Sequence, residues 1–149
     1  MSGITAKFSV KKSGIESVSL FLSKEISWEV EGSSHLDIDG WMECYLKGEP
    51  VPSLPLLWPK LTPFARDVYE AMATISFGSS LSYGQLAALA GFSKACRAVG
   101  TVCKNNRFPL IIPCHRVVAS RGLGGFAFGL EVKKALHNLE QNVIMQKKV

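Results

Sequence analysis

The sequence predicts an α/β protein in which a small α+β amino-terminal domain precedes a helical, winged-helix-like carboxy-terminal domain with a helix-turn-helix. Two observations predict this class. Five of the seven prolines fall between residues 50 and 63, which makes that stretch extended and helix-free. Apolar residues alternate with polar ones before the prolines, and recur every three to four residues after them. We therefore expect domains at residues 1–58 and 63–149, with a linker that ends near residue 62.

The amino-terminal unit is expected to hold two strands and one helix. Residues 6–11 and 18–23 alternate as strands do, and residues 39–48 predict a short helix that ends at Gly48. Nothing in this unit forms a catalytic pattern. Its tryptophans are most simply explained by packing in the core or between domains.

The carboxy-terminal unit is expected to begin with two helices. Pro63 suits the first turn of the first one. Its apolar residues follow at spacings of four, four and three, on one face: Phe64, Val68, Met72 and Ile75. Ser82 and Gln85 form a Ser-x-x-Gln capping box, which opens a short second helix stopped by Gly91.

The next segment predicts a helix-turn-helix. Ser93 is expected to cap a helix over residues 94–104, and the preceding helix is only a tight, Gly-containing turn away. The glycine-rich residues 121–125 suit a wing or hairpin. A last amphipathic helix is expected from about Leu130 to Gln141, with Leu136 and Leu139 facing inward.

Composition sets limits on location and on cofactors. The 149 residues contain no run of 18 apolar residues and no signal-peptide core, so we expect a soluble, cytoplasmic protein, nuclear if its host is eukaryotic. The four cysteines show no metal spacing, and the amino-terminal unit offers zinc only Cys44 and His35, half a tetrahedral site. We therefore expect no metal and no cofactor.

Charge is distributed unevenly along the chain. Residues 1–62 carry six Lys against eight acidic residues, a net charge of −2, and residues 63–149 carry eleven basic against four acidic residues, a net charge of +7. A basic half indicates a polyanionic partner such as DNA, because each neutralised phosphate releases counterions. The alternative is a solvated basic face with no partner.

Residues 112–118 read Ile-Pro-Cys-His-Arg-Val-Val, which places Cys114 beside His115 within an apolar stretch. A thiol becomes a nucleophile when a base is within reach. Taken alone, Cys114 could equally be an inert core cysteine, since free cysteine is among the most buried residue types.

The neighbouring segments resemble the O6-alkylguanine-DNA alkyltransferases, also called methylated-DNA-protein-cysteine methyltransferases. The resemblance covers roughly residues 63–140 and follows the family's order and spacing. It is carried by residues 82–91, 95–100, Asn106, 113–117, Lys133 and Glu140. It implies direct, single-turnover transfer of an alkyl group from the O6 atom of guanine in double-stranded DNA to the protein's own cysteine, without a cofactor and by a monomer.

The resemblance also implies the catalytic roles. Cys114 is the nucleophile, His115 takes the thiol proton through a water, and Glu140 orients the imidazole. Tyr83 helps to displace the backbone phosphate and donates a hydrogen bond to the flipped guanine. Asn106 braces the turn that carries the cysteine, and the neighbouring Arg116 is assigned mainly to structural hydrogen bonding under it.

Two further groups of residues follow from the resemblance. Arg97 takes the place of the flipped base, and small residues let its helix approach the minor groove, where recognition does not depend on sequence. The expected DNA-binding residues are Tyr83, Ser93, Ala95, Cys96, Arg97, Ala98 and Gly100. The expected pocket residues are Pro109, Val117, Phe126, Ala127 and Phe128.

Three departures from the family pattern stand out. Phe128 occupies a position where glycine is usual, and is expected to narrow the pocket against bulky alkyl groups. Arg107 stands where proline is frequent, which would loosen the loop before Cys114. Cys96 replaces an alanine beside Arg97.

Three other functions remain open at this point. A lesion-binding protein without chemistry would have the same fold, but such relatives carry another residue in place of Cys114. A Cys-His hydrolase would need an oxyanion hole and leaves Arg97 unexplained. A winged-helix transcription regulator would need an effector site, which the amino-terminal unit does not show.

Overall fold

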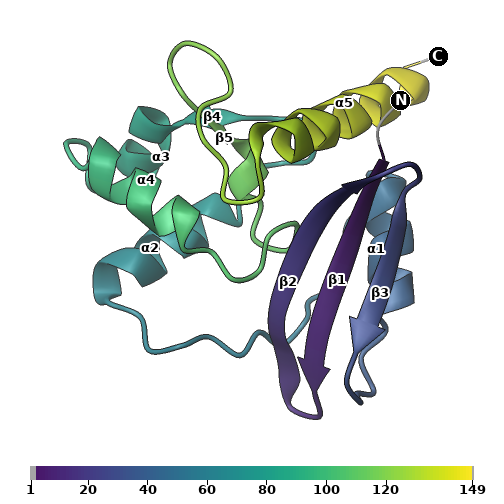
Figure 1. Ribbon diagram of the computed structural model, residues 1–149. Helices are drawn as coiled ribbons and strands as arrows, with labels where there is room; N and C mark the ends of the chain where they lie inside the picture. The colour runs from purple at the N-terminus through teal and green to yellow at the C-terminus, as the bar shows by residue number, and fades with distance from the viewer. Residues whose placement is uncertain (1–2, 149) are drawn as a thin grey trace.

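The computed structural model describes residues 3–148 and places a three-stranded sheet beside a group of helices (Figure 1). The strands β1 (Gly3–Lys11), β2 (Gly14–Ser23) and β3 (Ser27–Glu31) lie in the order β2-β1-β3. β1 runs antiparallel to β2 and parallel to β3. Both predicted strands are present and start earlier than expected. β3 was not predicted, although Trp28 and Val30 alternate with polar residues in it; the segment is short, and four of its five residues are exposed.

The inner face of the sheet packs against helix α1 (Ile38–Leu46). Alternate residues of β1 are buried, and Phe8 meets the ring of Trp41 edge-on at 6.4 Å. Asp37 caps α1 by accepting a hydrogen bond from the Gly40 amide, and Gly48 follows the helix with φ of +66°. The predicted helix and its glycine stop are confirmed.

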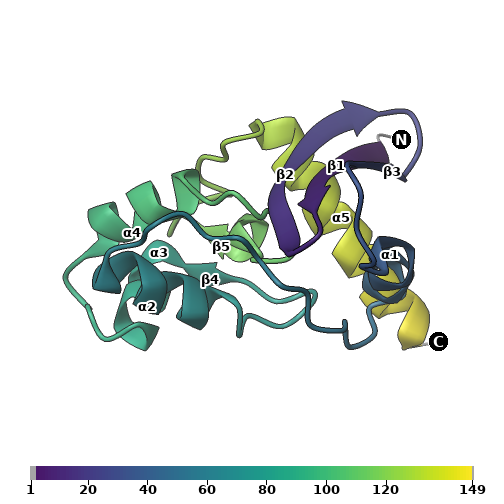
Figure 2. The same ribbon diagram turned by 90° about the horizontal axis from the view of Figure 1, so that it is seen from below.

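The proline-rich segment is free of helix, as predicted, and it is packed against the rest of the molecule. It runs from the side of the sheet and α1 to α2 (Figure 2). Ile15 of β2 donates its amide to Pro55 and accepts one from Leu57, at 2.9 and 2.8 Å. Trp58 stacks on Tyr69 with ring centroids 4.8 Å apart. One hydrophobic core therefore extends through both halves of the chain.

Helices α2 (Pro63–Met72), α3 (Tyr83–Leu89) and α4 (Cys96–Lys104) form the predicted helical group. The capping box of α3 is confirmed, since the Ser82 hydroxyl accepts from the Gln85 amide and the Gln85 side chain accepts from the Ser82 amide. Gly91 follows α3 with φ of +93° and ends it as expected. α3 and α4 pack together as a helix-turn-helix, which aims the first turn of α4 at solvent (Figure 1).

Two local predictions are wrong. Ser93 does not cap α4: a turn closed by the Ala95 amide and the Phe92 carbonyl delays the helix to Cys96, with no side-chain cap. The glycine-rich loop forms no hairpin, because residues 119–129 contain no strand. The strand pair of this region is instead β4 (Leu81–Ser82) with β5 (Val117–Val118), which run parallel.

The last helix, α5 (Leu130–Lys147), runs from the glycine-rich loop past the sheet toward α1 (Figures 1 and 2). It is longer than predicted, and Leu136 is buried while Leu139 is partly buried. Across residues 3–148, no helix combines the length and apolar composition that a membrane span requires. Within the same range, no group of three or more His, Cys, Asp and Glu side chains is placed to hold a metal ion.

Candidate active site

Cys114 begins a short 3-10 turn, η1 (Cys114–Arg116), between the apolar loop and β5. Its amide donates to the Ile112 carbonyl at 2.8 Å, which closes the turn around the preceding proline. The side chain is buried, with 5% of its surface exposed, and that remaining surface faces a cavity of about 420 Å³. The thiol is thus shielded from bulk water and open to a ligand in the cavity.

The cavity lies between α3, α4 and the glycine-rich loop. Six of its lining residues were predicted as site residues: Tyr83, Arg97, Gly100, Cys114, Phe126 and Ala127. Four were not: Thr101, Cys103, Lys104 and Gly125. The helical spacing of Arg97, Thr101 and Lys104 would have placed these three on one face of α4.

Three residues predicted for the pocket do not line this cavity. Val117 is fully buried in β5 and Pro109 is buried in the loop before the turn. Phe128 is half-buried and packs beside Phe126, with ring centroids 5.8 Å apart. The resemblance predicts a position along the chain, whereas the direction of a side chain depends on the local backbone of the loop.

Asn106 holds the loop that precedes the turn, as predicted. Its side-chain amide donates to the Ile112 carbonyl at 2.8 Å, and its side-chain oxygen accepts from the Phe108 amide at 3.0 Å. The Arg107 carbonyl accepts from the amide of Val18 in β2 at 2.9 Å, which braces the loop where a proline was expected. Backbone contacts therefore replace the rigidity that the missing proline would have supplied.

His115 is fully buried and points its Nε2 atom at Glu140 Oε2, 2.6 Å away. A nitrogen that faces a carboxylate carries the proton, which leaves Nδ1 as the basic atom. Within residues 3–148, Nδ1 is buried without a hydrogen-bond partner. The imidazole is therefore oriented with a free lone pair, the state that a general base requires.

Glu140 of α5 is the most heavily bonded side chain of the site. It accepts from His115, from two nitrogens of Arg116 at 3.0 and 3.1 Å, from the Gly78 amide at 2.9 Å and from the Tyr45 hydroxyl at 2.7 Å. Arg116 also donates to the Ile75 carbonyl at 2.7 Å, which confirms its structural role under the turn. These bonds fix the carboxylate rigidly beside the imidazole.

The electrostatics favour an ionised carboxylate beside a neutral imidazole. Burial by itself opposes ionisation of Glu140, but the hydrogen bonds from His115 and Arg116, together with the charge of Arg116, outweigh it and hold the pKa of Glu140 well below its usual range. Burial lowers the pKa of His115, and the Arg116 charge adds to this, although Glu140 works in the opposite direction. The lowered pKa favours the neutral imidazole, which is the form that can accept a proton.

The thiol needs such a base. Burial raises the pKa of Cys114 to about 11, while the Asn106 side chain and the Lys133 ammonium favour the thiolate. Burial also raises the pKa of Tyr83, so its hydroxyl keeps its proton and remains a hydrogen-bond donor. The cavity therefore offers a thiol to be activated on one side and a neutral phenol on another.

The first turn of α4 is open to solvent. Cys96, Arg97 and Ala98 are exposed, Ser93 lies exposed before the helix, and Ala95 and Gly100 are half-buried. Arg97 and Gly100 also line the wall of the cavity. This surface can approach a partner without rearrangement of the fold.

Three residues with contacts to the site received no role from the sequence: Tyr45, Lys133 and His137. Tyr45 lies in the amino-terminal unit, 95 residues from Glu140, and only its burial could be read from the spacing in α1. Lys133 lies two turns and His137 one turn before Glu140 on α5. Their helical spacing to Glu140 is a signal that could have identified both.

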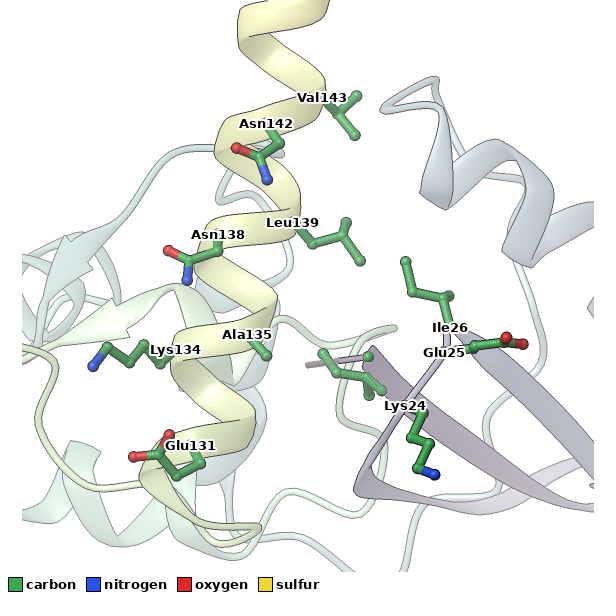
Figure 3. Close-up of a pocket in the computed structure, with 12 residues that line it drawn as sticks. Lys24, Glu25, Ile26, Glu131, Lys134, Ala135, Asn138, Leu139, Asn142 and Val143 are labelled. Atoms are coloured by element: carbon green, nitrogen blue, oxygen red, sulfur yellow. The ribbon is translucent and has the colours of Figure 1, made fainter. Parts of the chain in front are cut away.

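A larger hollow, of about 580 Å³, lies between α5 and the end of the sheet and holds no such chemistry. Figure 3 shows Leu139 and Val143 of α5 pointing toward Ile26 across this groove. Its rim carries lysine, glutamate and asparagine side chains, and neither a cysteine nor a histidine lines it. The smaller cavity at Cys114 is therefore the candidate active site.

Comparison with known proteins agrees with this location. A family model described as the DNA-binding domain of 6-O-methylguanine DNA methyltransferase matches residues 63–142. The constitutive methylated-DNA-protein-cysteine methyltransferase of Bacillus subtilis is 38% identical over 135 residues, which cover 82% of this chain and 81% of the relative. The methylated-DNA-protein-cysteine methyltransferase of Kluyveromyces lactis is 43% identical over 83 residues, which cover 55% of this chain and only 44% of that relative.

The fold is also similar to a solved structure. The crystal structure of Mycobacterium tuberculosis OGT in complex with DNA matches with a TM-score of 0.74 and 26% identity. The match covers 93% of this chain and 94% of the other. The similarity therefore includes the amino-terminal sheet as well as the helical unit that the family model matches.

Proposed function

This chain belongs to the methylated-DNA-protein-cysteine methyltransferase family, whose members repair DNA by alkyl transfer, and we propose that it moves the alkyl group of a flipped O6-alkylguanine irreversibly to Cys114. The observation that carries the proposal is the geometry of the buried His115, whose Nε2 lies 2.6 Å from Glu140 Oε2 and whose Nδ1 has no partner within residues 3–148. A buried polar atom without a partner is rare and calls for a functional explanation.

The chemical step balances without a cofactor. His115 accepts the thiol proton, through a water, and the Cys114 thiolate attacks the alkyl carbon. A carbon–sulfur bond forms, the bond between that carbon and guanine O6 breaks, and the electron pair stays on the guanine. Tyr83 donates a hydrogen bond that stabilises the departing base, and the proton from the thiol ends on the guanine or its surroundings. The product is a thioether, which water does not cleave, so each molecule acts once.

The DNA side of the proposal uses the open surface of α4. Guanine O6 lies inside a paired and stacked duplex, so the base has to leave the stack to reach the cavity. Arg97 is exposed at the mouth of the cavity and would occupy the space that the base vacates. The small residues Ala95, Ala98 and Gly100 allow α4 to lie close to the minor groove, with Cys96 and Ser93 beside the backbone.

Location and stoichiometry follow from this chemistry. One cysteine is consumed per lesion, so a monomer is sufficient for the reaction. The substrate is genomic DNA, so we place the protein in the cytoplasm with access to the nucleoid, or in the nucleus of a eukaryotic cell. The net charge of +7 on residues 63–149 supports a phosphate-dominated interaction.

The decisive experiment is intact-mass measurement after mixing the protein with duplex DNA that contains one O6-methylguanine. We expect the mass to rise by one methyl group in place of a hydrogen, with peptide mapping to Cys114 and restoration of guanine in the DNA. Tight binding with an unchanged mass would indicate a lesion-binding protein instead. Repeated turnover of an ester substrate without a stable adduct would indicate a Cys-His hydrolase.

A further inference from the structure

One face of α5 holds the whole turn that carries the acceptor cysteine. Lys133, His137 and Glu140 lie at positions i, i+4 and i+7 of the helix, which places them on one side. The Lys133 ammonium donates to the Val117 carbonyl at 2.6 Å, and His137 Nε2 donates to the His115 carbonyl at 2.5 Å. Glu140 binds the His115 ring, as described above. Three side chains on one face of α5 therefore hold the segment from His115 to Val117.

Lys133 makes further contacts at the cavity wall. Its ammonium also donates to the Gly125 carbonyl at 3.0 Å and lies 5.9 Å from the ring centres of Tyr83 and Phe126. The side chain has no exposed surface, which is rare for lysine. Burial of a lysine costs free energy unless hydrogen bonds or an opposite charge compensate its ammonium group. Here it joins the glycine-rich wall of the cavity to the strand that follows the turn.

We propose that Lys133 and His137 are positioning residues for alkyl transfer, which fix the acceptor turn by holding the carbonyls of Val117 and His115. The inference rests on the proposed function and assigns it two residues beyond the cysteine, histidine and glutamate. The ring of His137 stands edge-on to the ring of His115, with ring planes at 89°. Loss of the His137 side chain would therefore leave the His115 carbonyl without this donor and one side of the His115 ring without this neighbour.

Lys133 has a second effect on the thiol. Its charge favours the thiolate and so opposes the rise in the pKa of Cys114 that burial causes. In turn, burial lowers the pKa of Lys133 itself. The titratable or cationic groups that face Cys114 from the surrounding elements are Tyr69, Tyr83, Arg97, Cys103, Lys104 and His115. Of these, Arg97 and Lys104 line the cavity from α4, whereas Lys133 of α5 binds the Gly125 carbonyl in the cavity wall.

His137 is tested by a pair of substitutions on the same helix. His137→Leu keeps the volume and loses the donor, and we expect methyl transfer to slow by about tenfold, as for a loosened general base. His137→Gln restores an N–H donor and is expected to react within about threefold of the wild type. Asn138→Leu, at the exposed neighbouring position on α5, is the matched control and should react normally. Wild-type rates for folded His137→Leu would overturn the role of His137.

Lys133 is tested by the pH dependence of thiol reactivity, which a merely structural residue would leave unchanged. The rate of Cys114 modification by iodoacetamide is measured against pH and mapped by mass. Lys133→Met should move the midpoint upward by about one unit, a tenfold loss of thiolate at neutral pH, and Lys133→Arg should restore most of it. Lys134→Met, exposed on the groove side, is the control. An unmoved midpoint in folded Lys133→Met would overturn its role.

The two proposals fail in different ways. A wild-type protein that never gains a methyl group from O6-methylguanine DNA contradicts the proposed function, whatever the variants do. The iodoacetamide profile needs no DNA and reads the state of the turn directly. Normal methyl transfer by the wild type, combined with wild-type behaviour of both folded variants, would refute the positioning role alone.

Discussion

The acceptor turn and the first turn of α4 border the same cavity and differ in almost every physical respect. In the turn, His115 is fully buried and Arg116 nearly so, and each side chain is hydrogen-bonded to Glu140. On α4, Cys96, Arg97 and Ala98 are exposed. Chemistry at an alkyl carbon requires atoms held in fixed positions, whereas capture of a duplex requires a surface that a large partner can reach. The two regions should therefore fail separately when they are mutated.

Loss of the thiol should cause the largest effect. Cys114→Ser should abolish methyl transfer, because a hydroxyl is a far weaker nucleophile, yet affinity for methylated duplex should stay within about twofold, since the change removes little contact area. Filter binding and intact mass measure the two properties. Exposed Cys96→Ser is the control for thiol loss and should still accept the methyl group. Residual transfer by Cys114→Ser would show that another residue is the acceptor.

Glu140→Gln should affect both rate and stability. Removal of one partner from a buried ion pair typically costs about 3 kcal/mol or more, and the transfer rate should fall by about a hundredfold as His115 loses its orienting carboxylate. Urea unfolding and single-turnover kinetics at pH 7 measure these losses. Glu131→Gln, exposed on the same helix, should change neither. Wild-type kinetics in folded Glu140→Gln would remove Glu140 from the relay.

The wild type and Glu140→Gln should also differ in stability by an amount that depends on pH. The pKa of Glu140 is held below its unfolded value of about 4.3, so the stability it supplies is complete above that pH and is lost as the pH falls. The gap in unfolding free energy between the wild type and Glu140→Gln should therefore shrink from pH 6 toward pH 2. A constant gap would mean that the carboxylate is not ionised in the folded protein.

Arg97→Ala should affect only the binding of duplex DNA. Capture of a lesion in a duplex should weaken by about tenfold, while the reaction with the free base O6-benzylguanine should change by less than about twofold, because no base stack has to be filled. Equal losses on both substrates would place Arg97 in the chemical site. Lys24→Ala, exposed in the amino-terminal unit, controls for the loss of one positive charge.

The salt dependence of DNA binding is a further test of the exposed surface of α4. Affinity should fall steeply as salt rises, and removal of Arg97 or Lys104 should each reduce the slope by about one if these side chains contact phosphates. Lys24→Ala should leave the slope unchanged. A flat response in the wild type would contradict a phosphate-dominated interface.

Phe128→Gly should have the smallest effect. The sequence predicted that Phe128 narrows the pocket against bulky alkyl groups such as benzyl, but Phe128 does not line the cavity and packs beside Phe126. We now expect the ratio of benzyl to methyl rates to change by less than about twofold. Phe126→Ala, which removes a ring from the cavity wall, is the comparison and should raise that ratio. A larger change for Phe128→Gly would show that its ring enters the pocket.

Local signals in the sequence were sufficient for the elements that position the site. The capping box at Ser82 and Gln85 and the stops at Gly48 and Gly91 depend on neighbouring residues alone, and all are confirmed. Ser93 had the right residue type for a cap, but a competing turn shifted the helix start by two residues. Residue type identifies a possible helix cap, but it does not show whether the helix or a competing turn begins at that residue.

The relay shows where sequence reasoning ends. The resemblance predicted His115 and Glu140, and the structure brings them to 2.6 Å. It said nothing of the Tyr45 hydroxyl or the Gly78 amide, because both reach Glu140 through tertiary packing of distant segments. The direction of Phe128 could not be predicted either, since it depends on the local backbone of an irregular loop. Side-chain partners across long separations are a property of the folded chain.

The bond between Tyr45 and Glu140 has a consequence for how the protein is made. Tyr45 is synthesised 95 residues before its partner, and His115 is synthesised 25 residues before it. The relay is therefore completed only when the last helix of the chain has been made and has docked against both α1 and the turn that carries Cys114. A chain truncated before α5 keeps its cysteine and lacks the carboxylate that orients His115.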